Sequence, residues 1–290
     1  MERPIGIIGL GLVGTALAGR LLHAGKPIIG YDVAEPRRSA LRELGGDPKP
    51  SSGEVAAACD RLILSLPTTD VVESVIAEIE AQMRPGLMIV DTTTGEPQRT
   101  AALGAKLAAR GVNYLDATLV GSSAQIGRGE AVVIAGGEAD VFSQCEDLFA
   151  SLAHYWYHVG TWGSGARMKL VVNLVLGLNR AALAEGLSLA RQWELDPQLT
   201  LDVLRSGAAH SRVMDTKGDK MIREDFTPEA RLAQHLKDVR LILAAGQQLG
   251  AHLPLSRLHL ELLERVEAAG FGDADNSAII KAFQLPGRTN

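Results

Sequence analysis

The sequence predicts an α/β fold with a doubly wound parallel sheet, followed by an all-helical domain. In the first half, short apolar runs of strand type alternate with helix-length stretches, whereas the second half shows only helical patterns. The expected strands are residues 5–8, 28–31, 61–64, 87–90, 113–115 and 131–135. In such βαβ folds, ligands bind beyond the carboxyl ends of the strands.

The first expected strand leads directly into three glycines, Gly9, Gly11 and Gly14, and a helical stretch follows. Gly9 permits a tight turn, Gly11 lets a pyrophosphate approach the backbone, and Gly14 brings helix and strand together. The unpaired N–H groups at the start of the helix suit an anion. A turn that the glycines merely punctuate is the alternative. The context predicts a Rossmann-type dinucleotide site formed by Gly9, Gly11, Leu12, Val13 and Gly14.

An acidic residue, Asp32, follows the second expected strand, 18 residues after Gly14. This is close to the spacing of about 20 residues at which a carboxylate bonds to the adenosine ribose. Because a carboxylate there repels a 2′-phosphate, Asp32 favours NAD over NADP. Arg37 and Arg38 can reach a 2′-phosphate, but they are more typical of the start of a solvated helix. The sequence predicts NAD as the cofactor, with NADP as the alternative.

Composition favours an intracellular enzyme. The chain has 290 residues, of which 46% are hydrophobic, and its formal charge of −5 gives no basic footprint for nucleic acid. Two cysteines, Cys59 and Cys145, indicate neither a disulfide framework nor a metal cluster, and His154 and His158 lack further metal-ligand partners. No signal peptide or membrane-spanning apolar run is recognised. We expect a cytoplasmic protein with no metal, nucleic-acid or membrane partner.

The sequence changes character near residue 160. A nearly uninterrupted helical stretch runs from residue 166 to about residue 193, and helix breaks follow at residues 196–197, 206–207, 226–228, 250–254 and 269–272. We therefore expect a dinucleotide-binding domain over residues 1–162 and an all-helical domain over residues 163–290, joined by the long helix. Residues 286–290 are expected to form a loose tail.

Two polar residues, Lys169 and Asn173, interrupt the apolar sequence of the long helix. They are four residues apart and so share one face of the helix. In the structural alternative, the lysine extends to water and the asparagine bonds to a neighbouring helix. In the functional interpretation, a partly desolvated lysine beside a nicotinamide exchanges a proton with a reacting alcohol or carbonyl. Asn173 then orients the substrate or the lysine.

Six motifs follow one another along nearly the whole chain. They are Gly9-x-Gly11-x-x-Gly14, Leu66-Pro67, Asp91-Thr92-Thr93-Thr94, Asp116-Ala117, Gly163-x-Gly165-x-x-x-Lys169-x-x-x-Asn173 and Lys237-Asp238. In this order they resemble the β-hydroxyacid dehydrogenase family, which includes 3-hydroxyisobutyrate dehydrogenases and tartronate semialdehyde reductases. The resemblance implies a Rossmann domain, a helical domain for substrate and oligomerisation, and a homodimer or homotetramer.

The resemblance also implies a reaction and the residues that perform it. The enzyme interconverts a small 3-hydroxy acid and its semialdehyde or 3-oxo acid by hydride transfer with NAD(P). By the resemblance, Lys169 is the catalytic general acid/base and Asn173 orients the substrate. Lys237 approaches both nicotinamide and substrate. The remaining implied cofactor contacts are Leu66, Pro67 and Thr94.

One segment departs from the family pattern. The family usually has Asp-Ala-Pro-Val-Ser-Gly-Gly, whose Ser-Gly-Gly binds the substrate carboxylate, but residues 116–123 read Asp-Ala-Thr-Leu-Val-Gly-Ser-Ser. Val120 therefore stands in the place of the serine. Gly121, Ser122 and Ser123 are expected to bind the substrate through backbone N–H groups and a replacement hydroxyl. A role as turn residues is the alternative for the two serines.

Two other functions remain open. Imine reductases share this architecture, but they typically have another residue at the position of Lys169, so the lysine argues against C=N reduction. A non-catalytic dinucleotide-binding protein is compatible with the change at Val120, because fold alone does not establish function. It predicts tight NAD binding without turnover of any hydroxy acid.

Overall fold

The computed structural model describes residues 3–284, so the expected tail lies outside the described residues. The chain divides into two compact units, Met1–Lys169 and Leu170–Asn290. The boundary expected after residue 162, between a dinucleotide-binding domain and an all-helical domain, stays a prediction.

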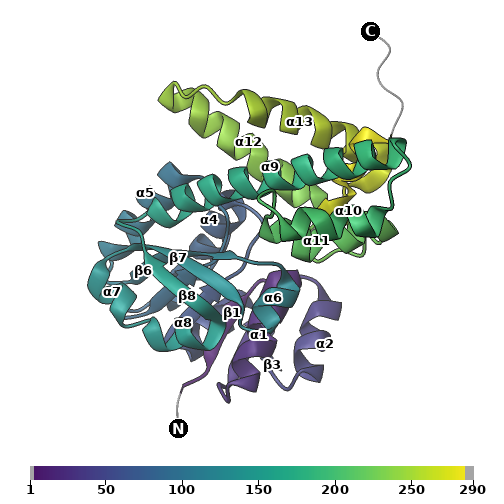
Figure 1. Ribbon diagram of the computed structural model, residues 1–290. Helices are drawn as coiled ribbons and strands as arrows, with labels where there is room; N and C mark the ends of the chain where they lie inside the picture. The colour runs from purple at the N-terminus through teal and green to yellow at the C-terminus, as the bar shows by residue number, and fades with distance from the viewer. Residues whose placement is uncertain (1–2, 285–290) are drawn as a thin grey trace. The chain divides into compact units, whose positions relative to one another are not determined.

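The first unit contains an eight-stranded sheet in the order β3-β2-β1-β4-β5-β6-β7-β8 (Figure 1). Neighbouring strands are parallel except for β6 and β7. The strands are β1 (Ile5–Ile8), β2 (Ile28–Tyr31), β3 (Asp47–Pro48), β4 (Arg61–Leu64), β5 (Met88–Asp91), β6 (Asn113–Val120), β7 (Ala131–Gly137) and β8 (Ala153–His158). The predicted doubly wound parallel sheet is confirmed, and the sheet also contains one antiparallel pair, β6 and β7. A short connection after β6 returns the chain along the same strand, which gives an antiparallel pair.

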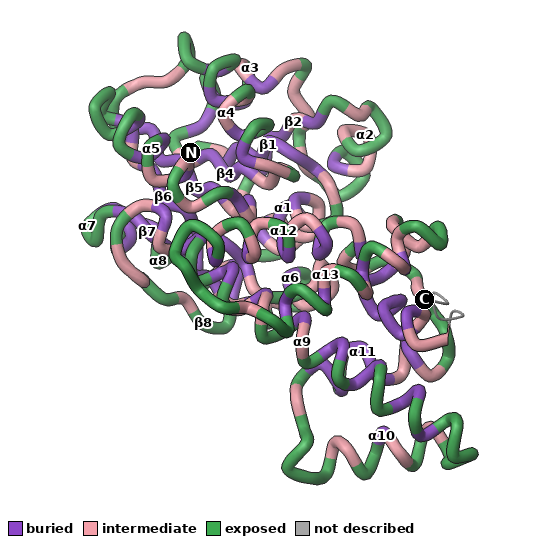
Figure 2. The backbone as a smooth tube through the Cα atoms, turned by 90° about the horizontal axis from the view of Figure 1, so that it is seen from above, coloured by how far each residue is buried: buried purple, intermediate pink, exposed green. Residues whose placement is uncertain are grey.

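Helices cover both faces of this sheet. They are α1 (Leu12–His23), α2 (Glu35–Glu43), α3 (Ser52–Ala58), α4 (Thr69–Glu78), α5 (Pro97–Ala108), α6 (Ser123–Gly127), α7 (Ala139–Ser143) and α8 (Glu146–Leu152). Alternate strand residues enter different cores: Ile7 packs in the cluster with α1 and α8, and Ile8 packs in the cluster with α3 and α4. Burial on both faces explains why the strands are continuous apolar runs, and Figure 2 shows the central strands as buried.

The second unit is helical, as predicted. The long helix α9 (Ser164–Gln192) is followed by α10 (Pro197–Ser206), α11 (Arg212–Arg223), α12 (Leu232–Leu249), α13 (Pro254–Val266) and a 3₁₀ segment over Asn276–Phe283. Pro197 in the first turn and the Asp196 side chain, which accepts a hydrogen bond from Leu199 N at 2.6 Å, fix the start of α10. Leu187 of α9 lies in the core of this unit with Leu236 of α12.

Helix α9 is long and apolar enough to cross a membrane by length and composition alone, contrary to the reading of the sequence. Its most apolar 18-residue window has a mean hydropathy of 1.4. The helix nevertheless has buried polar side chains, Lys169, Asn173 and Arg180. Ala181, Leu183, Ala184 and Leu187 contribute to the core of the helical unit. Of the apolar window, 39% is buried, so core packing accounts for part of its apolar composition.

Candidate active site

The turn between β1 and α1 has the geometry that a dinucleotide requires. A Cβ on Gly14 would overlap the carbonyl oxygen of Gly9, so α1 packs directly against the turn. A Cβ added to Gly11 would lie 4.0 Å from its nearest neighbour, Arg37 Nη1. The backbone at Gly11 therefore has room beside it for an anion. Helix α1 begins with no side-chain cap and no acid in its first turn. Its N–H groups and the glycine turn therefore fit a pyrophosphate.

Asp32 lies at the end of β2, but its carboxylate is engaged within the protein. It accepts hydrogen bonds from Leu10 N at 2.8 Å, Ala34 N at 2.9 Å and the Arg37 guanidinium at 3.1 Å. Burial raises the pKa of this carboxyl, but the hydrogen bonds and the charge of Arg37 outweigh burial and hold the pKa below its usual value. The Asp32 side chain is 4% exposed, whereas Arg37 is 46% exposed. Arg37 is thus an ion-pair partner of Asp32, which the sequence did not predict.

The loops that follow β4 and β5 lie at the same edge of the sheet as the glycine turn. Strand β4 pairs in parallel with β1, and β5 with β4, so their carboxyl ends are neighbours. Leu66 N donates a hydrogen bond to Thr93 Oγ1 at 3.2 Å, which joins the two loops. The structure therefore brings Leu66, Pro67 and Thr94 to the edge that carries the glycine turn.

Strand β6 forms hydrogen bonds with the backbone at the start of α9. The Asp116 carboxylate accepts hydrogen bonds from Gly163 N at 3.0 Å and Ala166 N at 2.9 Å. A Cβ on Gly165 would overlap the carbonyl oxygen of Asp116, so the helix approaches the strand too closely for a side chain there. This contact explains why glycine stands at residue 165 in the motif that leads to Lys169.

Lys169 is buried near the same strand. Its Nζ donates a hydrogen bond to the carbonyl oxygen of Leu119 at 2.5 Å, and the residue is 9% exposed. The last paired residue of β5 is Asp91, opposite Asp116, so Leu119 lies past the carboxyl end of β5. The amine is therefore bonded to the part of β6 that extends beyond the edge where dinucleotides bind.

The altered segment after Val120 forms a small capped helix. Ser122 Oγ accepts a hydrogen bond from Gln125 N at 3.3 Å, and Ser122 N donates to Gln125 Oε1 at 2.9 Å. This reciprocal pair is a capping box at the start of α6, and Ser123 is the first residue of that helix. The backbone N–H of Ser122 is therefore engaged within its own loop. Gly121 has a φ of +150°.

Two predicted site residues of the helical unit share one acid. Asn173 Nδ2 donates a hydrogen bond to Asp238 Oδ2 at 2.8 Å, and Lys237 Nζ forms an ion pair with Asp238 Oδ1 at 3.1 Å. The sequence placed Asp238 in a motif without giving it a role. The structure shows that it binds both Asn173 and Lys237.

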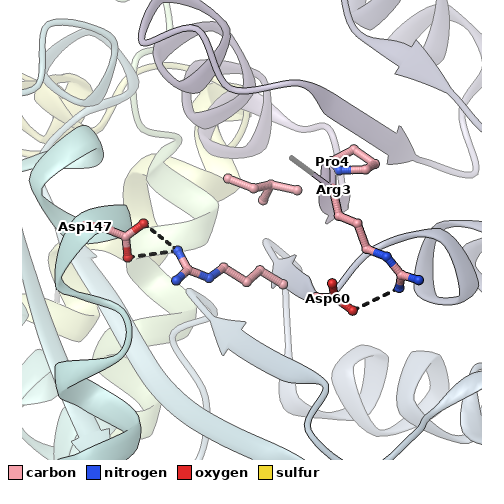
Figure 3. A pocket seen from close by; sticks show the side chains of 6 residues that line it. Arg3, Pro4, Asp60 and Asp147 are labelled. Atoms are coloured by element: carbon pink, nitrogen blue, oxygen red, sulfur yellow. Dashed lines mark hydrogen bonds and ion pairs between the residues drawn. The ribbon is translucent and has the colours of Figure 1, made fainter. Parts of the chain in front are cut away.

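A pocket lies at the opposite edge of the sheet, at the amino ends of β1 and β4 (Figure 3). It is lined by Arg3, Pro4, Ile5, Asp60, Arg61 and Asp147. Arg3 pairs with Asp60 at 3.0 Å, and Arg61 pairs with Asp147 at 2.7 Å. Because these charges form ion pairs with one another at the amino edge, the pocket is not the expected ligand site.

Comparison with known proteins identifies both halves of the chain. Residues 4–160 match the family model of the NAD-binding domain of 6-phosphogluconate dehydrogenase. Residues 163–283 match the model described as NAD-binding of NADP-dependent 3-hydroxyisobutyrate dehydrogenase. The chain belongs to the β-hydroxyacid dehydrogenase family. The resemblance inferred from the motifs is confirmed, and the protein is an NAD(P)-dependent oxidoreductase of this family.

Individual members of the family match over nearly their full length. L-threonate dehydrogenase of Cupriavidus necator is 30% identical, over 99% of each chain. The 2-hydroxy-3-oxopropionate reductase of Escherichia coli is also 30% identical, over 97% of each chain. A crystal structure of 3-hydroxyisobutyrate dehydrogenase from Salmonella typhimurium has a TM-score of 0.89 at 27% identity and covers 97% of this chain and 99% of its own.

Proposed function

We propose that this β-hydroxyacid dehydrogenase interconverts a small 3-hydroxy acid and its semialdehyde or 3-oxo acid. The observation that carries the proposal is a buried lysine, Lys169, bonded to strand β6 beyond the sheet edge that bears the open glycine turn. The names of the two curated relatives, which act on threonate and 2-hydroxy-3-oxopropionate, support a small hydroxy acid as the substrate class.

In the proposed mechanism, Lys169 moves the proton of the reacting oxygen. A bound nicotinamide supplies the hydride acceptor or donor. In the oxidation, Lys169 Nζ accepts the hydroxyl proton, and in the reduction it donates a proton to the carbonyl oxygen. The Leu119 carbonyl orients the amine. Asn173, held by Asp238, orients the substrate, and the charge of Lys237 stabilises the alkoxide-like oxygen.

We assign the substrate carboxylate to Gly121, Ser122 and Ser123. Because the Ser122 N–H is bonded to Gln125, the hydroxyl proton of Ser122 is the donor that this residue offers. A panel of C3 and C4 3-hydroxy acids, followed by the nicotinamide absorbance at about 340 nm, tests the proposal, with Lys169→Ala as the control. Turnover that depends on Lys169 supports it, whereas tight cofactor binding without turnover favours the non-catalytic alternative.

The proposed cofactor is NAD, with weak discrimination against NADP. Asp32 at the end of β2 supports NAD, but Arg37 neutralises the carboxylate that would repel a 2′-phosphate. We expect Arg37→Gln to raise the ratio of the Kd for NADP to the Kd for NAD by about tenfold, or about 1.4 kcal/mol. Isothermal titration calorimetry measures both constants. Arg42→Gln removes the same charge from the same helix and serves as the control, and an unchanged ratio in Arg37→Gln contradicts the role.

The proposed assembly is a cytoplasmic homodimer or homotetramer. Helix α9 and the residue after it carry exposed apolar side chains at helical spacing, namely Val171, Val175, Leu189 and Trp193. Such an apolar strip is typical of a surface that binds another protein. Sedimentation equilibrium should give at least twice the chain mass of 30.8 kDa, and Val175→Glu should lower the measured mass. A monomer at micromolar concentration contradicts this assembly.

A further inference from the structure

Asp116 lies between the sheet and the start of α9, and the proposed mechanism gives it no role. It is 1% exposed, and both of its carboxylate oxygens accept a backbone N–H group from the start of the helix, at Gly163 and Ala166. The first N–H groups of a helix lack partners within the helix and attract negative charge. Asp116 therefore anchors this end of α9 to β6.

The same short segment of helix carries Lys169. Lys169 follows Ala166 by three residues, slightly less than one helical turn. Its amine bonds to Leu119, three residues after Asp116 on β6. Between these two points, Thr118 Oγ1 lies 3.4 Å from the carbonyl oxygen of Gly165. The strand thus fixes the helix backbone through Asp116 and the lysine amine through Leu119.

We propose that Asp116 is a positioning residue that sets the place of the Lys169 amine during proton transfer. This inference rests on the proposed function, because it requires Lys169 to be the proton donor and acceptor. A displacement of about 1 Å at a catalytic group can lower a rate about 100-fold. A shift of the first turn of α9 would therefore change turnover without altering the glycine turn that binds the dinucleotide.

The ionisation of Asp116 provides a second readout. Burial, together with the neighbouring Asp91, raises its pKa to about 7, against the lowering effect of the two hydrogen bonds. The titratable groups that act on this carboxylate are Asp91 on β5 and Tyr114 on β6. From α9 it meets backbone N–H groups, and from β7 it meets Gly136. Below about pH 7, protonation of Asp116 weakens one of the two carboxylate oxygens as a hydrogen-bond acceptor. The start of α9 is then held less firmly on β6.

The first test compares Asp116→Asn and Asp116→Ala with the wild-type enzyme in the reduction direction. Asparagine lacks one acceptor and places an amide N–H₂ opposite a backbone N–H, whereas alanine removes both acceptors. We expect kcat to fall about 10- to 100-fold in both variants, while calorimetry shows an unchanged Kd for the dinucleotide. Ser52→Ala is the control, because it removes a buried hydroxyl from α3, away from Asp116, and should leave kcat unchanged.

The second test is the pH profile of reduction, in which a protonated Lys169 is already the active form at low pH. The wild-type kcat should decline below about pH 7, and Asp116→Asn should remove this acid limb. Absence of the limb in the wild type, its survival in Asp116→Asn, or an unchanged kcat in a folded Asp116 variant overturns the inference. Wild-type turnover in Lys169→Ala would instead overturn the proposed function.

Discussion

Replacement of Lys169 by alanine is expected to lower kcat by about 10³- to 10⁴-fold, near the upper range for loss of a general acid or base. The amine is buried and held by the Leu119 carbonyl, so water does not readily replace it as a positioned proton carrier. The glycine turn is untouched. We therefore expect calorimetry to give the wild-type Kd for the dinucleotide within about twofold.

Two control variants test whether kcat falls because proton transfer is lost. One keeps the positive charge at residue 169, and the other removes a lysine elsewhere. Lys169→Arg keeps a positive charge but removes an amine that can exchange its proton, so its kcat should resemble that of the alanine variant. Lys106→Ala, in the last turn of α5, removes a lysine outside the proposed site and should leave kcat unchanged. If Lys169→Ala turns over its substrate at the wild-type rate in both directions, Lys169 is not the acid/base.

Much of the fold could be predicted because the elements that position the site carry local signals. Strands β1, β2 and β4 are buried over most of their length, so they are mainly apolar and have the predicted bounds. Strand β3 has only two residues, too few to give a pattern. Strand β8 has exposed tyrosines, Tyr155 and Tyr157, so it lacks the apolar run by which the other strands were recognised.

The positions of the predicted site residues in the fold follow from local patterns, but their hydrogen-bond partners do not. The three glycines lie at the turn from β1 into α1, and Lys169 and Asn173 lie on α9. The roles of these residues stay predictions. The bonds from Asp116 to Gly163 and from Lys169 to Leu119 join residues 47 and 50 positions apart, and such pairings depend on the folded chain. Ser122 is a different case, since Gln125 three residues later is a sequence signal of its capping box.

Replacement of Gly14 by alanine is expected to raise the Kd for the dinucleotide at least about 100-fold, or about 2.7 kcal/mol. The added Cβ would overlap the carbonyl oxygen of Gly9 and lie 2.9 Å from the carbon of that carbonyl. Both atoms belong to the backbone, so no side-chain rotation relieves the clash. The first turn of α1 and the glycine turn must separate, which displaces the N–H groups that face the pyrophosphate.

Gly19→Ala is a matched control, because Gly19 lies in the same helix and its Cβ would meet no atom within 4 Å among the described residues. That substitution should leave the Kd unchanged and raise the free energy of unfolding by about 1 kcal/mol, since alanine favours a helix over glycine. Calorimetric titration with NAD and thermal unfolding of both variants provide the comparison. A wild-type Kd in Gly14→Ala would show that close packing of α1 on the turn is not required for binding. Of the two residues, only Gly14 contacts the glycine turn. If both variants lose the same affinity for NAD, the cause is therefore a change in α1 as a whole and not the contact with the turn.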